Sequence, residues 1–100
     1  MSEDFRNLGD VDRVIHEPGR LMIVAILSAV EIADFLYLLR ETGLTKGNLS
    51  AHLSRLEQAG YVEIEKGFRG KIPQTTCRLT DKGRAAFDDY RERMKRLVGH

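Results

Sequence analysis

The sequence has few of the residues that mark disulfide-bonded, metal-binding or membrane proteins. Cys77 is the only cysteine among 100 residues, which excludes an intrachain disulfide and a cysteine-cluster metal site. The longest apolar run, Leu21–Leu27, is far shorter than the roughly 18 residues of a membrane span. The chain also lacks a basic start followed by an apolar export segment, so we expect a cytoplasmic protein with no membrane role.

Signatures of enzymes are missing as well. The sequence contains no Gly-rich phosphate loop after a strand, no nucleophile elbow and no HExxH pair, and its carboxylates are scattered among arginines. His16, His52 and Cys77 lie far apart and lack the spacing of paired metal ligands. We therefore predict that the protein is not an enzyme and that it uses no cofactor and no metal.

The net charge is small but unevenly distributed. It is +1 overall, in a chain that is 42% apolar and 31% charged, as is ordinary for a single globular domain. Residues 1–44 carry a net charge of −4, residues 45–77 carry +2 and residues 78–100 carry +3. This polarity is what we expect if one face meets phosphate, although such asymmetry also arises by chance.

The apolar run belongs to a predicted helix that extends from Pro18 to Ala29. Pro18 suits the first turn of a helix, and Leu21–Leu27 is apolar on every side of it. Either a second copy of the chain covers the surplus apolar side, or the N- and C-terminal segments wrap it. Within residues 1–17, the apolar positions before Pro18 have helical spacing and predict a short helix.

Two further helices, separated by a tight turn, are predicted next. An extended piece or short strand at Val30–Ile32 leads to Asp34, a good N-cap for a helix over Phe35–Thr42 that ends at Gly43. The third helix spans Thr45–Ala59. Its N-cap is Thr45, and one of its faces carries Leu49, Leu53 and Leu56.

After Gly60 the pattern alternates, which predicts a β-hairpin. The first strand starts at Tyr61 and reaches Lys66, Gly67–Pro73 forms a basic turn, and Gln74–Leu79 returns. A last helix over Asp81–Val98 then begins after Thr80. It carries a narrow apolar seam suited to packing on another helix, made of Phe87, Tyr90, Met94 and Leu97.

This order of elements is the winged helix-turn-helix arrangement, a mainly α fold with a small β-hairpin (α+β). Residues 44–62, with 16–21, 68–76 and 79–83, resemble winged-helix transcriptional regulators, above all the small one-domain relatives of the MarR and ArsR repressors. The resemblance covers about residues 12–90. It implies a dimeric DNA-binding protein whose third helix enters the major groove, whose wing follows the backbone and whose outer helices build the dimer.

Two features depart from these relatives. The cysteine-rich metal sites of the ArsR proteins have no counterpart in this sequence. Leu36 and Tyr37 stand where relatives are more polar, which implies extra burial or a partner surface.

The residues expected to contact DNA lie on the outer face of the third helix and in the wing. Arg55 can pair with guanine or clamp a phosphate, and Asn48 can match adenine. Arg69 and Lys71 in the wing suit the minor groove or the backbone. The alternative is a solvated helix and turn. The helix residues are Thr45, Lys46, Gly47, Asn48, Ser50, Ala51, Ser54 and Arg55.

Other polar positions have two interpretations each. We expect His52 to pack and bond to the backbone of the neighbouring helix, with a DNA contact as the alternative. Cys77 is expected to be a small buried residue rather than a redox switch. Lys66 and Arg78, on the stem of the hairpin, are expected either to contact phosphates from the side or to be solvent-exposed residues without a role in binding.

These predictions define a domain plan and a function. Residues 1–17 form an N-terminal arm at the dimer interface, residues 18–80 the DNA-binding core and residues 81–100 the dimerisation helix. We expect a homodimeric, sequence-specific transcriptional regulator of double-stranded DNA. The alternative is a winged-helix module for protein–protein interaction. The sequence leaves open the operator, repression or activation, and whether a small-molecule effector binds, since no group of residues marks such a site.

Overall fold

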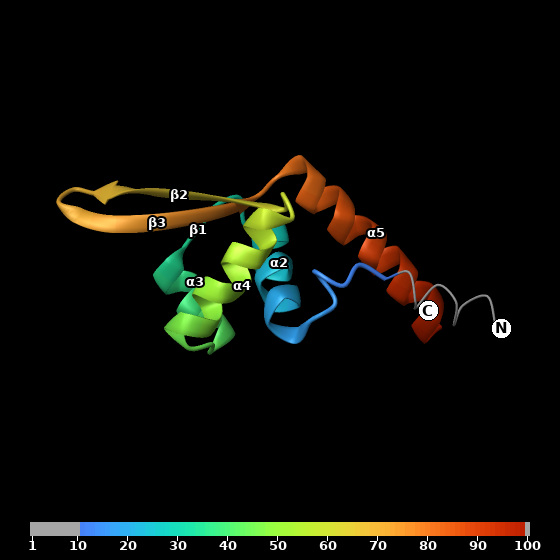
Figure 1. Cartoon of the computed structure of the whole chain (residues 1–100). Coiled ribbons are helices and arrows are strands. Elements are labelled where there is room, and N and C mark those ends of the chain that lie inside the picture. The colour runs from blue at the N-terminus through green and yellow to red at the C-terminus, as the bar shows by residue number, and fades with distance from the viewer. Residues whose placement is uncertain (1–10, 100) are drawn as a thin grey trace.

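A computed structural model describes residues 11–99 of the chain as four helices and a three-stranded antiparallel sheet. Helices α2, α3 and α4 pack below one end of the sheet, the β2–β3 hairpin extends to one side, and α5 extends to the other (Figure 1). This is the predicted winged helix fold. The elements are α2 (Pro18–Ala29), β1 (Ala33–Asp34), α3 (Phe35–Thr42), α4 (Lys46–Gln58), β2 (Val62–Arg69), β3 (Ile72–Leu79) and α5 (Asp81–Val98).

The helices begin and end where their capping residues predict. The side chains of Asp34 and Thr45 accept hydrogen bonds from backbone N–H groups in the first turns of α3 and α4, and Thr80 does the same for α5. Gly43 ends α3 at φ 70°, a conformation that glycine adopts without strain. These caps fix the short connection that sets α4 against α3.

The core lies between the three packed helices and the inner face of the sheet. α2 buries Ile23, Val24 and Leu27 completely, whereas Met22 is 38% exposed and Ala25 is also exposed. The apolar run is therefore covered by its own chain on one side and open on the other. From α4 the core receives Leu49, Leu53 and Leu56.

The first strand lies later in the chain than predicted. We expected an extended piece at Val30–Ile32, but the strand is Ala33–Asp34, which pairs with Cys77 and Thr76 of β3. Val30 is extended as the C-cap of α2. Ala33, 4% exposed, is small enough to be buried opposite Cys77, whereas Ile32 is 57% exposed. Burial against β3 therefore decides where the pairing begins.

The hairpin is longer and its turn shorter than predicted. The expected turn over Gly67–Pro73 is reduced to Gly70 and Lys71, because both strands continue through the glycine and the proline. Gly70 adopts φ 65°, as two-residue hairpin turns require at their first position. Pro73 pairs with Phe68 next to the closing pair, where an antiparallel ladder does not use the missing N–H.

The segment before α2 joins the core to α5. Over residues 11–17 it makes one helical turn, in which Asp12 accepts hydrogen bonds from the N–H groups of Val14 and Ile15. The other carboxylate oxygen of Asp12 accepts from the hydroxyl of Tyr61. The ring of His16 is 2.8 Å from the hydroxyl of Tyr90 in α5. The remainder of the predicted N-terminal arm, residues 1–10, lies outside the described residues.

α5 leaves the core after its first three turns. Phe87 and Tyr90 of the predicted seam are buried, Met94 and Leu97 are half-buried, and Val98 is 75% exposed. Among residues 11–99, no helix combines the length and the apolar character that crossing a membrane demands.

Candidate nucleic-acid interface

The outer face of α4 presents every helix residue that the sequence predicted for DNA contact. With the three leucines buried on the opposite side, all eight residues from Thr45 to Arg55 in the predicted set are exposed. Their side chains are short apart from Lys46 and Arg55, so the helix surface is nearly flat and can approach base edges closely. Such a surface fits a major groove about 12 Å wide.

The first turn of α4 carries a set of open backbone donors. The hydroxyl of Thr45 accepts from the N–H of Asn48 at 3.1 Å, while the N–H groups of Lys46 and Gly47 have no intrahelical partner. A Cβ at Gly47 would meet nothing within 4 Å, so the backbone here is fully accessible. A helix N-terminus of this kind attracts phosphate through its N–H groups and its dipole.

The basic residues of α4 and of the outer hairpin form no ion pairs with other residues in the 11–99 range. This differs from Arg78, on the outer face of the hairpin stem, whose Nε lies 2.8 Å from a carboxylate oxygen of Glu63. On α5, Arg91 and Arg93 are likewise paired with acidic residues one turn away. The cations without such a partner are Lys46, Arg55 and Lys66 on the interface side, and Arg69 and Lys71 at the end of the hairpin.

A hollow of about 640 Å³ separates α4 from the inner face of the hairpin. Ser50 and Ser54 line it from α4, and Lys66 and Thr75 line it from the strands. Glu57 lies at the same hollow and gives it one negative charge. Arg69 and Lys71 lie beyond the hollow, at the end of the hairpin, so the predicted site residues form two groups with this space between them.

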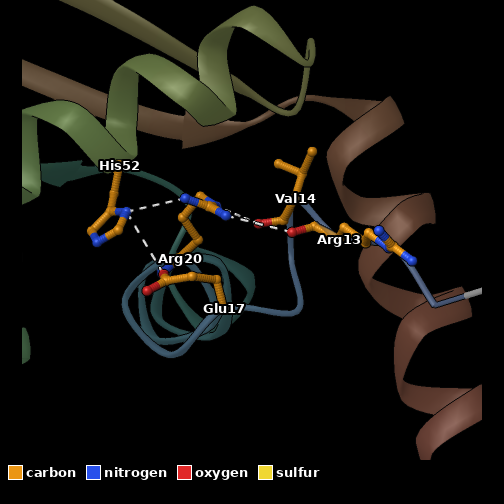
Figure 2. A network of polar contacts seen from close by, with 5 residues as sticks. All are labelled: Arg13, Val14, Glu17, Arg20 and His52. Carbon is orange, nitrogen blue, oxygen red and sulfur yellow. Dashed lines mark hydrogen bonds and ion pairs between the residues drawn. The ribbon is translucent and has the colours of Figure 1, made fainter. Parts of the chain in front are cut away.

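Behind α4, a polar network fixes the helix to α2 and to the segment before it (Figure 2). Nδ1 of His52 lies 3.3 Å from Nη1 of Arg20 and 3.7 Å from a carboxylate oxygen of Glu17, the N-cap of α2. A guanidinium has only donors, so Nδ1 accepts this bond. Arg20 also donates from Nε to the carbonyl oxygen of Val14 at 2.5 Å. His52 thus accepts a hydrogen bond from the Arg20 side chain of α2. The expected bond to the backbone of the neighbouring helix is wrong.

The packing beneath this network is close. A Cβ at Gly19 would lie 2.6 Å from Nε2 of His52, so α2 and α4 approach each other at a position where only glycine fits without movement. The network therefore holds the inner side of α4 while its outer face stays free.

Comparison with known proteins identifies the family. The winged helix DNA-binding domain family matches residues 20–98 of the chain. The chain belongs to this family. An uncharacterised protein of Methanocaldococcus jannaschii is 38% identical over 79 residues, which cover 78% of this chain and 85% of the relative.

Solved structures of transcriptional regulators share this fold. A transcriptional regulator homologue from Pyrococcus horikoshii is 26% identical, with a TM-score of 0.87 over 93% of this chain and 94% of that one. A MarR-family regulator from Silicibacter pomeroyi shares the fold at 23% identity and a TM-score of 0.65, over 99% and 69% of the two chains. The structural neighbours are regulators of the MarR and ArsR families, as the sequence predicted.

The lone cysteine of the winged helix domain is buried on β3, where it pairs with Ile64. Cys77 is 1% exposed, and burial raises the pKa of its thiol to about 11, with the charges of Glu57 and Asp34 adding to the shift. Within the described part of the chain, no three His, Cys, Asp or Glu side chains come close enough to hold a metal ion.

Sequence reasoning gave no role to Phe68 and left Lys66 undecided. Both lie on the inner face of β2, in the alternation that starts with Val62 and Ile64. This alternation continues past Gly67 in the sequence and could have placed Phe68 on the inner face of the strand. Because the prediction starts the turn at Gly67, the predicted strand ends at Lys66, three residues before the end of β2 at Arg69.

Proposed function

We propose that the chain is a sequence-specific transcriptional regulator that binds double-stranded DNA as a homodimer. α4 lies in the major groove, where Arg55 and Asn48 read bases, and the wing places Arg69 and Lys71 on the backbone or in the minor groove. The observation that carries the proposal is the exposed, nearly flat face of α4 flanked by cations that have no acidic partner within residues 11–99.

Binding of fluorescently labelled duplexes, selected from a random pool, tests this proposal. We expect Arg55→Ala to weaken the selected duplex about tenfold or more and random DNA much less, because a bidentate base contact is lost. The double variant Arg69→Ala/Lys71→Ala should weaken both duplexes and lower the salt dependence, since each phosphate contact contributes about 0.9 to its logarithmic slope.

Arg78→Ala is the matched control, because Arg78 belongs to the same hairpin but is paired with Glu63 on the outer face. It should leave both affinities unchanged. Absence of binding to every duplex at low salt would refute the proposal. Equal losses of DNA affinity in Arg78→Ala and Arg69→Ala would refute the proposed orientation of the hairpin on the duplex.

The homodimer is supported by the surfaces at the α5 end of the molecule. The chain is elongated, with extents of 57 × 25 × 23 Å, and α5 continues past Met94, which packs at the edge of the core, to half-buried Leu97 and to Val98, which is 75% exposed. The last turn of this helix offers Leu97 and Val98 to a second copy. Two α4 helices would then meet successive major grooves about 34–36 Å apart.

A protein-interaction module without DNA-binding duty is the second candidate, and Leu36 favours it. Leu36 is 67% exposed at the start of α3, whereas Tyr37 is half-buried and its ring lies under the guanidinium of Arg40. A large exposed leucine on the DNA-binding side suits a protein partner. A stable partner retained in high salt, together with absent DNA binding, would decide for this candidate.

The chain carries out no catalysis and acts in the cytoplasm on the DNA that it regulates. A small-molecule effector would be recognised by weaker or stronger binding of the selected duplex when cell metabolites are added.

A further inference from the structure

Phe68 is the most exposed large apolar residue of the hairpin. Its side chain is 73% exposed, although a phenylalanine gains most when it is buried. It stands two residues before Gly70, where both strands have left the core, and it pairs with Pro73 across the ladder. Among residues 11–99, no apolar neighbour buries this ring, so the fold itself does not explain its place.

The face on which Phe68 lies is the one that faces α4. Side chains alternate along a strand, so Phe68 shares its face with Lys66, Ile64 and Val62. Ile64 and Lys66 line the hollow opposite Ser50 and Ser54 of α4. Phe68 is the next position along this face, just beyond the residues that line the hollow.

The charges around Phe68 select a polyanion as the occupant. Lys66 precedes it on the same face, and Arg69 and Lys71 follow it at the tip, all without an acidic partner in the described residues. The ring and its partner Pro73 thus lie beside cations without acidic partners, Lys66 on the same face and Lys71 in the turn. An apolar ring beside cations is complementary to a sugar–phosphate strand, which presents both carbon-rich sugars and charged phosphates.

The dimensions of the minor groove place the ring at its edge. Two residues of extended chain span about 6.6 Å, and the groove is about 7.5 Å deep. When the turn reaches the groove floor, Phe68 lies at the level of the deoxyribose rings, which present carbon atoms rather than charge.

We propose that Phe68 is an apolar DNA contact, whose ring packs on the deoxyribose of the strand that crosses the hollow between α4 and the hairpin. This rests on the proposed DNA-binding function and deepens it. Lys66 holds the phosphate of that strand inside the hollow. Phe68 contributes affinity that depends neither on base sequence nor on salt, because it releases no counterion.

The test measures affinity for selected and random duplexes as a function of salt. Phe68→Ala should weaken both duplexes about tenfold, as expected for partial burial of one phenylalanine, and leave the salt slope unchanged. Lys66→Gln should weaken both as well, but with a lower slope. The control is Ile72→Ala, because Ile72 is 69% exposed beside the same turn but lies on the opposite face of the hairpin. It should bind like the wild type.

Each outcome bears on the proposal. Wild-type affinity of Phe68→Ala, a lowered salt slope in that variant, or an equal loss in Ile72→Ala would overturn it while leaving the DNA-binding function intact. A change of sedimentation in Phe68→Ala with unchanged DNA affinity would assign the ring to a second copy of the chain instead. Loss of binding in the wild type itself would overturn both proposals. Circular dichroism checks that each variant is folded.

Discussion

At the scale of single residues, the structure is held by a few polar contacts that connect distant segments. Tyr61, just after α4, donates to the carboxylate of Asp12, and the same carboxylate group caps the turn before α2. Because the phenol is partly buried and faces a carboxylate, the pKa of Tyr61 rises from 10.0 to about 12. This contact ties the N-terminal segment to the end of α4.

Replacing Tyr61 should therefore lower stability and change its dependence on pH. We expect Tyr61→Phe to lower the free energy of unfolding by about 1 kcal/mol at pH 7 through the lost hydrogen bond. In the wild type, the unfolded chain loses the phenolic proton near pH 10 and the folded chain only near pH 12. Stability is thus fully present below pH 10 and falls as the pH rises to 12.

Urea unfolding at pH 7 and pH 11 measures both effects. The fall between these two pH values should be smaller in Tyr61→Phe than in the wild type. Tyr37→Phe serves as the control, since Tyr37 makes no hydrogen bond through its hydroxyl with residues 11–99. An equal fall in all three proteins would refute the role of the phenol.

Cys77 should be chemically inert in the folded protein. The thiolate is the reactive form, and with a pKa of about 11 only about one thiol in a thousand is ionised at pH 8. We expect an aromatic disulfide reagent to modify native Cys77 at least a hundredfold more slowly than the denatured chain. Modification at the same rate in both states would show that β3 opens far more easily than its burial indicates.

At the scale of elements, the sequence predicted the helices better than the strands. Helix ends depend on local chemistry, and the caps Asp34, Thr45 and Thr80 can be read directly from the chain. Strand ends depend on partners that are distant in sequence. The pairing of Ala33 with Cys77 could not be foreseen, because it joins residues 44 positions apart.

In the candidate site, too, features with local causes could be predicted and features that depend on tertiary packing could not. The exposed face of α4 follows from its leucine period, so the exposure of all eight helix residues could be predicted. The hollow between α4 and the hairpin results from tertiary packing, as does the network of Arg20, Glu17 and His52. Neither has a local signature, and the position of Phe68 became meaningful only once the length of the hairpin was known.

Two glycines in helices should respond to alanine in opposite ways. A Cβ at Gly83 in α5 would overlap the carbonyl oxygen of Tyr61, which is backbone and cannot turn away. Gly83→Ala should destabilise the protein by about 2–3 kcal/mol. Gly47→Ala in α4 meets nothing within 4 Å and should stabilise it by about 0.5 kcal/mol.

Thermal or urea unfolding of both variants checks this pair, and each glycine acts as the control for the other. Helix propensity alone would stabilise both variants, so a stabilised Gly83→Ala would show that α5 does not pack on Tyr61 as described.

At the scale of the whole molecule, the chain is longer than one small core requires. Its radius of gyration is 14.9 Å, against about 13 Å expected for 100 compact residues. The excess comes from the hairpin at one end and α5 at the other (Figure 1). The first end carries the candidate DNA surface, and the second carries the apolar residues that we assign to a second copy.

The chain should therefore sediment at twice its mass of 11.4 kDa. Leu97→Glu, in the half-buried part of α5, should yield a folded monomer and weaken binding to the selected duplex. Ala85→Glu adds the same charge at an exposed position of the same helix and should remain dimeric. Sedimentation equilibrium measures both. A monomeric wild type, or the same sedimentation mass for the two variants, would refute the proposed dimer.

The long hairpin has a consequence for how the wing meets its target. Beyond Gly67 and Gln74, whose side chain donates a hydrogen bond to Asp34, neither strand pairs with a third strand among residues 11–99, so their mutual hydrogen bonds carry most of the pairing. Local opening of such a ribbon takes little free energy, and its amide protons should exchange with solvent within the native state. The wing can thereby adjust to grooves of different width. Slowed exchange of individual amides on duplex binding would show which residues of the wing the DNA covers.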